Sequence, residues 1–218
     1  MSMRSEPASD SIPMLRPDAY AGRGFFFRES LKSLSVTASL FPSSRFLASA
    51  LLRPIDFDRT RVIVELGMGT GAITTEILRR MAPGSILLAI EVNPAFVAHV
   101  RSKVHDSRFV PISGRAERLG SILGKRGVRR ADAIVSSLGL TSMAHDLRST
   151  IVEQAAGHLG QNGVLTQYQY LSGKPNWVRA LGLKGVAEEN FLREYFREVR
   201  SERVIWNIPP ANVYTCRL

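Results

Sequence analysis

The sequence predicts an α/β protein with a doubly wound, seven-stranded sheet that is parallel apart from an antiparallel strand near the C-terminus. Apolar runs of strand length alternate with segments of helical spacing, which is typical of parallel sheets with right-handed crossovers. Near the C-terminus, two strand-like segments, 200–206 and 212–218, flank the short link "NIPPA". Because this link is too short for a parallel crossover, these two strands must pair antiparallel.

The first predicted strand, "VIVEL" at 62–66, runs directly into a glycine-rich turn. Gly67, Gly69 and Gly71 occupy alternate positions, and a segment with helical spacing follows as far as Met81. A strand, a glycine turn and a helix together favour a cofactor held against bare backbone. The spacing is not the G-x-G-x-x-G of dinucleotide sites, and no Lys-Ser/Thr pair follows as in a phosphate loop.

An acidic residue, Glu65, stands just before this turn. A carboxylate there repels phosphate and favours a cation. S-adenosylmethionine (SAM) fits this requirement, since it has a sulfonium, a free amino-acid end and no phosphate. We therefore predict SAM as the cofactor, with the glycines at positions where a Cβ would collide with it. The alternative is a glycine-rich turn that only allows tight packing.

The remaining elements continue the alternation of strands and helices. A second strand, 85–91, ends in Glu91, and Asn93 caps a helix that Pro94 opens. The later expected elements are strands at 108–113, 131–137 and within 159–171, and helices at 116–124, 145–159 and within 176–198. Two further helices, 25–40 and 43–52, are expected before the first strand, separated by Pro42.

Ligands of an open α/β sheet bind beyond the carboxyl ends of its strands, so the cofactor residues are expected at these exits. Glu91 at the second exit can accept hydrogen bonds from both ribose hydroxyls, and burying its carboxylate without such a partner would be costly. Arg115, Ala116 and Glu117 at the third exit are expected beside the adenine. The fourth exit begins at Ser136 and is expected to lie nearest the reacting methyl group.

Composition limits the class of protein and its partners. The chain has 218 residues, 44% of them hydrophobic, and no apolar run approaches the ~18 residues of a membrane-spanning helix. The N-terminal residues 1–24 contain no apolar core of a signal peptide, so a cytoplasmic location is expected. Cys216, the single cysteine, excludes an internal disulfide and offers no metal-binding pair; no metal is predicted. The net charge of +10 indicates an anionic partner, either nucleic acid or an anionic membrane.

Five segments in this order carry a family resemblance: "RESLKSLSVTASLFPSSRFLASALL", "VELGMGTGAIT", "AIEVNPAFV", "SSLGLTSM" and "NIPPANVY". They resemble bacterial phospholipid N-methyltransferases, which methylate phosphatidylethanolamine stepwise, and the resemblance covers about residues 25–218. It implies a Rossmann-like, class I SAM-dependent methyltransferase fold and a peripheral membrane enzyme. It also implies that Gly67, Gly69, Gly71 and Glu91 hold SAM and that Ser43 and Ser44 close over the site. The sequence departs from the family's pattern at Met68 and Gly139, where proline is usual, and at Arg115, where an acid often meets the adenine amine.

The resemblance divides the chain into a flexible tail, 1–24, N-terminal helices that form a membrane and cofactor flap, 25–58, and a methyltransferase domain, 59–218. The first of the helices is amphipathic: its apolar residues lie near one face, with basic residues around it. The apolar residues are Phe26, Phe27, Leu31 and Leu34, and the basic ones are Arg23, Arg28 and Lys32. This face is expected to bind an anionic membrane on its inner side; the alternative is a helix that packs on its own domain.

Methyl transfer to an amine requires a neutral acceptor, whereas a primary ammonium has a pKa of ~10.4. His145, Asp146, Tyr168 and Tyr170 are the polar or aromatic residues near the fourth and fifth exits. We expect Tyr168 and His145 to act at the acceptor, since tyrosine faces attract methylated ammonium. The alternatives are that the His145-Asp146 pair caps a helix and that the tyrosines pack within a strand.

Three rival functions remain to be compared with phospholipid N-methylation. An rRNA adenine dimethyltransferase shares the first motif but needs an N-L-P-Y-like motif to stack the flipped base, where this chain has "SSLG". A cytosine-5 methyltransferase needs a nucleophilic cysteine, and Cys216 lies on the wrong strand. An inactive SAM-binding scaffold is the third. We therefore expect SAM-dependent N-methylation of phosphatidylethanolamine or a related aminolipid, with nucleic acid not a partner; the sequence leaves the number of methyl groups and the oligomeric state open.

Overall fold

The computed structural model describes residues 43–171, 183–207 and 209–218, so the predicted tail and the helix expected at 25–40 lie outside the described residues. The described strands are β1 Val62–Leu66, β2 Ile86–Glu91, β3 Phe109–Ser113, β4 Ala131–Ser136, β5 Leu159–Tyr170, β6 Glu198–Val204 and β7 Ala211–Arg217. The helices are α2 Ser43–Leu52, α3 Ala72–Arg80, α4 Pro94–Lys103, α5 Leu119–Gly124, α6 His145–His158 and α8 Leu183–Arg193, with 3-10 turns η2 Ala116–Arg118 and η3 Leu140–Ser142.

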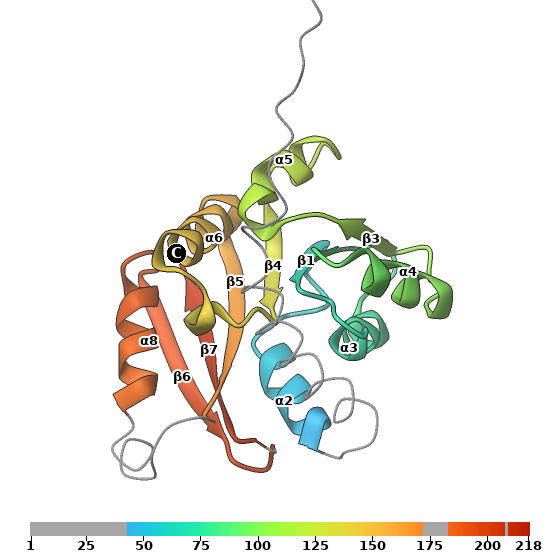
Figure 1. Ribbon diagram of the computed structural model, residues 1–218. Helices are drawn as coiled ribbons and strands as arrows, with labels where there is room; N and C mark the ends of the chain where they lie inside the picture. The colour runs from blue at the N-terminus through green and yellow to red at the C-terminus, as the bar shows by residue number, and fades with distance from the viewer. Residues whose placement is uncertain (1–42, 172–182, 208) are drawn as a thin grey trace, which may run out of the picture. The chain divides into compact units, whose positions relative to one another are not determined.

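All seven strands belong to a single sheet with the order β3-β2-β1-β4-β5-β7-β6 (Figure 1). β7 is antiparallel to both of its neighbours, β5 and β6, and the other neighbouring pairs are parallel. The predicted α/β fold with an antiparallel strand near the C-terminus is confirmed. Since β7 is antiparallel to both β5 and β6, these two strands run parallel to each other and end at the same edge of the sheet.

The apolar runs become strands that are covered on both faces of the sheet. Every residue of β1 and β2 after the first is buried, as expected of central parallel strands. One core cluster joins one sheet face to apolar residues of α2, α3 and α4, and the other joins the opposite face to α5, α6 and α8. Leu51 and Leu52 of α2 are fully buried in the first cluster. No helix among the described residues is both long and apolar enough to cross a membrane.

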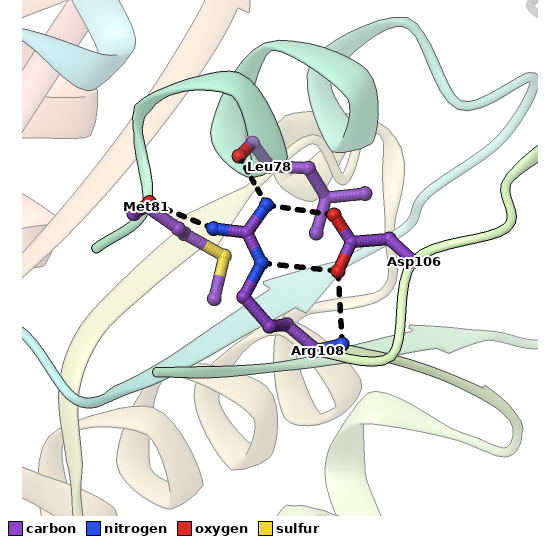
Figure 2. Close-up of polar contacts among 4 residues, drawn as sticks. All are labelled: Leu78, Met81, Asp106 and Arg108. Carbon is purple, nitrogen blue, oxygen red and sulfur yellow. Dashed lines mark hydrogen bonds and ion pairs between the residues drawn. The ribbon is translucent and has the colours of Figure 1, made fainter. Parts of the chain in front are cut away.

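A polar cluster at the start of β3 closes the C-terminal end of α3 (Figure 2). The Arg108 guanidinium donates hydrogen bonds to the carbonyl oxygens of Leu78 and Met81, at 2.9 and 2.7 Å. The last carbonyls of a helix lack partners within it, so the guanidinium acts as a cap contributed by a different element. The Asp106 carboxylate accepts from the same guanidinium at 2.7 Å, and this hydrogen bond lowers the pKa of Asp106.

Three element boundaries differ from the sequence-based expectation. The helix expected at 145–159 ends at His158, and β5 begins directly after it at Leu159, with an irregular "GQNG" segment and a register shift against β4. The helix expected at 116–124 is divided into η2 and α5. β6 ends at Val204, which pairs with Ala211, so Ile205 and Trp206 lie outside the strand in which they were expected.

Candidate cofactor and active site

Backbone hydrogen bonds bring four strand exits together at one edge of the sheet. The Gly67 N–H donates to Ile90 O at 2.8 Å and the Ser137 N–H donates to Leu66 O at 2.8 Å. The Gly114 N–H, just after β3, donates to Glu91 O at 2.9 Å. The exits of β1, β2, β3 and β4 therefore form one continuous edge, where open α/β sheets bind their ligands.

Glu91 is buried at the end of β2, and backbone groups fix its carboxylate. Its Oε2 accepts from the Gly69 N–H at 3.1 Å, and its Oε1 accepts from the Asn93 N–H at 2.9 Å. The Asn93 side chain in turn caps α4 by accepting from the Ala95 N–H. Because a carboxylate oxygen can accept more than one hydrogen bond, both oxygens keep capacity for a ligand diol.

The glycines of the turn have different structural roles. At Gly67 the backbone φ of +81° lies in the left-handed region, which favours glycine, and an added Cβ would lie 2.9 Å from Leu138 Cδ2. At Gly69 no atom of the described residues lies within 4 Å of an added Cβ, although its φ of +51° lies in the left-handed region. The turn therefore presents bare backbone to open space at Gly69, which is the arrangement needed for close approach of a cofactor. Gly71, also at positive φ, precedes the first turn of α3.

Glu65 is fully buried in β1 and has only one of its oxygens hydrogen-bonded within the described chain. Thr74 Oγ1 donates to its Oε2 at 2.7 Å, whereas Oε1 has no hydrogen-bond partner there. Burial raises the pKa of Glu65 to about 7, and the nearby charge of Glu91 contributes. An unpaired buried carboxylate oxygen is destabilising unless a ligand supplies a donor. The ammonium of SAM is a suitable donor, so the residues at this edge fit the predicted cofactor.

The third and fourth strand exits carry further predicted site residues. Arg115 forms an ion pair with Glu117, two residues further along the chain, and Ala116 begins η2. Ser136 is buried, and its Oγ accepts a long hydrogen bond of 3.5 Å from the Leu138 N–H. Ser43 and Ser44 are the first two residues of α2, and their side chains lie outside the described part of the chain.

The fifth exit brings the two predicted tyrosines together. Tyr168 and Tyr170 are partly buried on the sheet face that α2 covers, with ring centroids 5.1 Å apart in an edge-to-face arrangement. Burial raises the pKa of both, and the hydrogen bond that the Tyr168 hydroxyl donates to Tyr170 raises that of Tyr168 further. His145 is placed differently: it begins α6 with its side chain 77% exposed, and its ring centroid lies 6.2 Å from that of Phe191 in a T-shaped arrangement. The acceptor roles of Tyr168 and His145 remain predictions.

Sequence reasoning missed Gln167, which connects the fourth and fifth exits. Its Nε2 donates to Leu138 O at 2.8 Å and to Tyr168 O at 2.7 Å, so it holds the loop after β4 against the end of β5. Its Oε1 is buried and has no partner among the described residues. The alternation in "QYQY" could have indicated this residue, because it places Gln167 on the sheet face opposite the tyrosines.

Cys216 is buried in β7, away from the strand exits, and burial raises its pKa to about 12. It is therefore a neutral thiol at physiological pH, which is unlike a nucleophilic cysteine. Within residues 43–171, 183–207 and 209–218, no group of three or more His, Cys, Asp or Glu side chains could hold a metal ion.

Comparison with known proteins identifies relatives in sequence and in structure. No protein-family model matches the sequence. The chain is 31% identical over 201 residues to the ornithine lipid N-methyltransferase of Singulisphaera acidiphila, covering 92% of this chain and 96% of that protein.

Solved structures with the same fold are SAM-dependent methyltransferases with varied acceptors. The Burkholderia thailandensis 1,6-didemethyltoxoflavin-N1-methyltransferase, solved with S-adenosylhomocysteine, superposes with a TM-score of 0.66 at 20% identity, covering 95% of this chain and 92% of that chain. Human N-acetylserotonin methyltransferase, solved with SAM, has a TM-score of 0.59 at 15% identity, covering 88% and 55%. From its sequence relative, its fold and the groups at its strand exits, the chain belongs to the lipid N-methyltransferase family of class I SAM-dependent methyltransferases, with SAM as its cofactor.

Proposed function

We propose that this enzyme transfers methyl groups to the amine of a membrane aminolipid, with phosphatidylethanolamine and ornithine lipid as the two candidate acceptors. The likeness to an ornithine lipid N-methyltransferase along 92% of the chain carries the proposal. Both acceptors present a primary amine on a flexible headgroup at the bilayer surface. A site at the open edge of a sheet can receive such a headgroup while the acyl chains stay in the membrane.

The carboxylates and the glycine turn bind the cofactor in this proposal. SAM supplies the activated methyl group on its sulfonium. Glu91, fixed by the Gly69 and Asn93 N–H groups, accepts from the ribose hydroxyls. Glu65 offers its free oxygen to the ammonium, and Gly69 allows close approach of the cofactor to the backbone. Arg115, Ala116 and Ser136 flank the adenine and the methyl group.

Tyr168 orients the acceptor amine. Its hydroxyl hydrogen is directed to Tyr170, so the remaining lone pairs of its oxygen can accept an N–H from the amine. A partly buried site disfavours the ammonium form, which helps the amine to lose its proton before transfer. Once methyl groups have been added, the aromatic face attracts the methylated cation. Positioning of a neutral amine in line with the methyl group is then the main contribution of the protein to the rate.

Peripheral attachment to the inner face of the cell membrane, from the cytoplasm, completes the proposal. The net charge of +10 favours an anionic lipid surface, and the amphipathic segment 25–40 has the pattern of an interfacial helix. These features support reversible attachment that weakens as salt rises, because the charges are screened within ~10 Å at 0.1 M salt.

The substrate is tested by transfer of radiolabelled methyl groups to vesicles that contain phosphatidylethanolamine, ornithine lipid or neither. We expect label in at least one of the two aminolipids and none in aminolipid-free vesicles. Tyr168→Phe should lower kcat while SAM affinity is kept, because it removes the oxygen but not the ring. Label in undermethylated ribosomal RNA and none in either lipid would overturn the proposal in favour of an RNA enzyme. SAM binding without turnover of any amine would indicate an inactive scaffold.

The cofactor residues are tested by calorimetry, which does not depend on the acceptor. Glu91→Ala should weaken binding of SAM and S-adenosylhomocysteine at least tenfold, since each charge-assisted hydrogen bond is worth ~1.5–3 kcal/mol. Asp58→Ala removes an exposed carboxylate elsewhere and serves as the matched control. Equal affinity of the two variants would contradict the assignment.

A further inference from the structure

The turn between β6 and β7 exposes two adjacent apolar side chains. Ile205 is 60% exposed and Trp206 is 73% exposed, more than any other large apolar residue in the described chain. They directly follow Val204, the last residue of β6, which is buried. Two neighbouring large apolar side chains that are mostly exposed indicate a surface that a membrane or another molecule covers.

Buried polar contacts fix the backbone of this turn. Asn207 is buried, and its Nδ2 donates to Pro209 O at 2.6 Å. Its side chain also hydrogen-bonds the Tyr170 hydroxyl, and the Leu171 N–H donates to Pro210 O at 2.8 Å. The turn that exposes Ile205 and Trp206 is thus tied to the end of β5, where Tyr168 and Tyr170 lie.

The exposed pair lies at the edge of the sheet that carries the cofactor residues. Because β6 runs parallel to β5, β4, β1 and β2, its end and the following turn lie at the carboxyl edge, as Glu91 does. α2 contacts β6 and β7, and the start of α2 lies at the same end of the sheet as the β6–β7 turn (Figure 1). The first turn of α2 adds Phe46, which is 50% exposed, and the exposed Arg45. Arg203 is exposed beside the turn itself.

We propose that the β6–β7 turn is a membrane-insertion element, in which Ile205 and Trp206 enter the interface of an anionic bilayer and hold the tyrosine end of β5 at headgroup level. The inference rests on the proposed function, which requires a lipid substrate to reach this edge. Tryptophan prefers the membrane–water interface, where its ring is apolar and its N–H is hydrated. The flanking Arg45 and Arg203 suit anionic headgroups.

A lipid surface fits this turn better than a protein partner does. Stable protein interfaces bury about 800 Å² on each partner, far more than two side chains on a narrow turn provide. A bilayer needs no complementary shape, since it closes around any apolar side chain that enters it. A basic rim around a small apolar tip is the arrangement typical of interfacial insertion.

Tryptophan fluorescence tests insertion directly. The chain has two tryptophans, so Trp177→Phe leaves Trp206 as the only indole. On addition of anionic vesicles we expect a blue shift of its emission and quenching by lipids brominated on their upper acyl carbons. Sedimentation of this variant with the vesicles, with neither a shift nor quenching, would overturn the proposal, because the protein would then bind through another surface.

Substitution of the tip separates its role from folding and from the chemistry. Ile205→Ser with Trp206→Ser should lower the vesicle partition coefficient at least tenfold while the circular dichroism spectrum and SAM affinity stay unchanged. Leu218→Ser, at a side chain 39% exposed beyond the end of β7, is the matched control and should bind vesicles normally. Methylation by the double variant should fall on vesicles and be retained on the same aminolipid in detergent micelles. Equal partition of double variant and control would refute the insertion role. If no aminolipid is methylated in either form, the proposed function fails, whereas the fluorescence result still decides insertion.

A pair of charge reversals tests where the attraction is located. Arg45→Glu with Arg203→Glu removes the basic rim, and Lys125→Glu with Arg129→Glu changes the net charge equally at exposed residues before β4, at the opposite edge. At low salt we expect the first pair to reduce vesicle binding at least fivefold more than the second. Equal losses would show that total charge rather than this edge attracts the membrane, and would overturn the assignment of the docking surface.

Discussion

Replacement of Glu65 by glutamine should stabilise the protein at neutral and alkaline pH and weaken cofactor binding. The side chain is fully buried, and its pKa rises from 4.5 to about 7 because burial disfavours the charged form. A raised pKa means that the folded state holds a proton that the unfolded state has already released. The stability associated with this proton is complete below pH 4.5 and is lost as pH rises through about 7.

The size of the effect follows from the two pKa values. At about 1.4 kcal/mol for each pKa unit, the loss between pH 4.5 and pH 8 is about 3 kcal/mol. Glutamine has the same shape and can still accept the Thr74 hydrogen bond, but it has no charge to bury. The free energy of unfolding of Glu65→Gln relative to wild type should therefore rise by about 3 kcal/mol over this range.

Urea unfolding followed by circular dichroism, at a series of pH values for both proteins, measures this difference. Other titrating groups cancel in the comparison, and Asp58→Asn, at an exposed carboxylate, provides a control whose difference from wild type should be flat. A difference for Glu65→Gln that does not change between pH 4.5 and 8 would refute the reasoning. At pH 8 the same variant should bind SAM more weakly than wild type by calorimetry, since the cation loses its carboxylate partner.

Three further predictions follow from single contacts. Gly69→Ala should lower the free energy of unfolding by about 1–2 kcal/mol, because the left-handed backbone at Gly69 disfavours any Cβ even though no atom of the described residues lies within 4 Å of it. The same substitution should abolish SAM binding, as measured by calorimetry. Arg108→Ala should lower the free energy of unfolding by about 1–3 kcal/mol, because α3 loses its C-terminal cap. Arg129→Ala, at an exposed arginine, is the control and should change this free energy little. Equal urea midpoints of the two variants would contradict the capping role. Gln167→Leu should lower kcat at least tenfold with little change in SAM affinity, because it removes the hydrogen bond that holds the loop after β4. An unchanged kcat would show that other contacts hold this loop.

The sequence by itself determined the sheet and the edge at which the cofactor is predicted to bind. Strand identity follows from apolar runs and link length, and both are local properties that need no knowledge of packing. The positions of Glu65 and Glu91 at adjacent exits follow from topology, since parallel neighbouring strands end at the same edge. The direction of β7 follows from the link between it and β6, which allows only an antiparallel pair.

Tertiary structure alone decided which groups at that edge are paired, buried or exposed. Ile205 and Trp206 have strong strand propensity and were expected in the sheet, but β6 ends at Val204, before both of them, and the buried Asn207 closes the turn that exposes them. Gln167 contacts a carbonyl 29 residues away, a relation that no local pattern encodes. The raised pKa of Glu65 likewise depends on burial by segments distant in sequence. Solvent exclusion is a property of the packed chain, and it sets the cost of a charge or an unpaired oxygen.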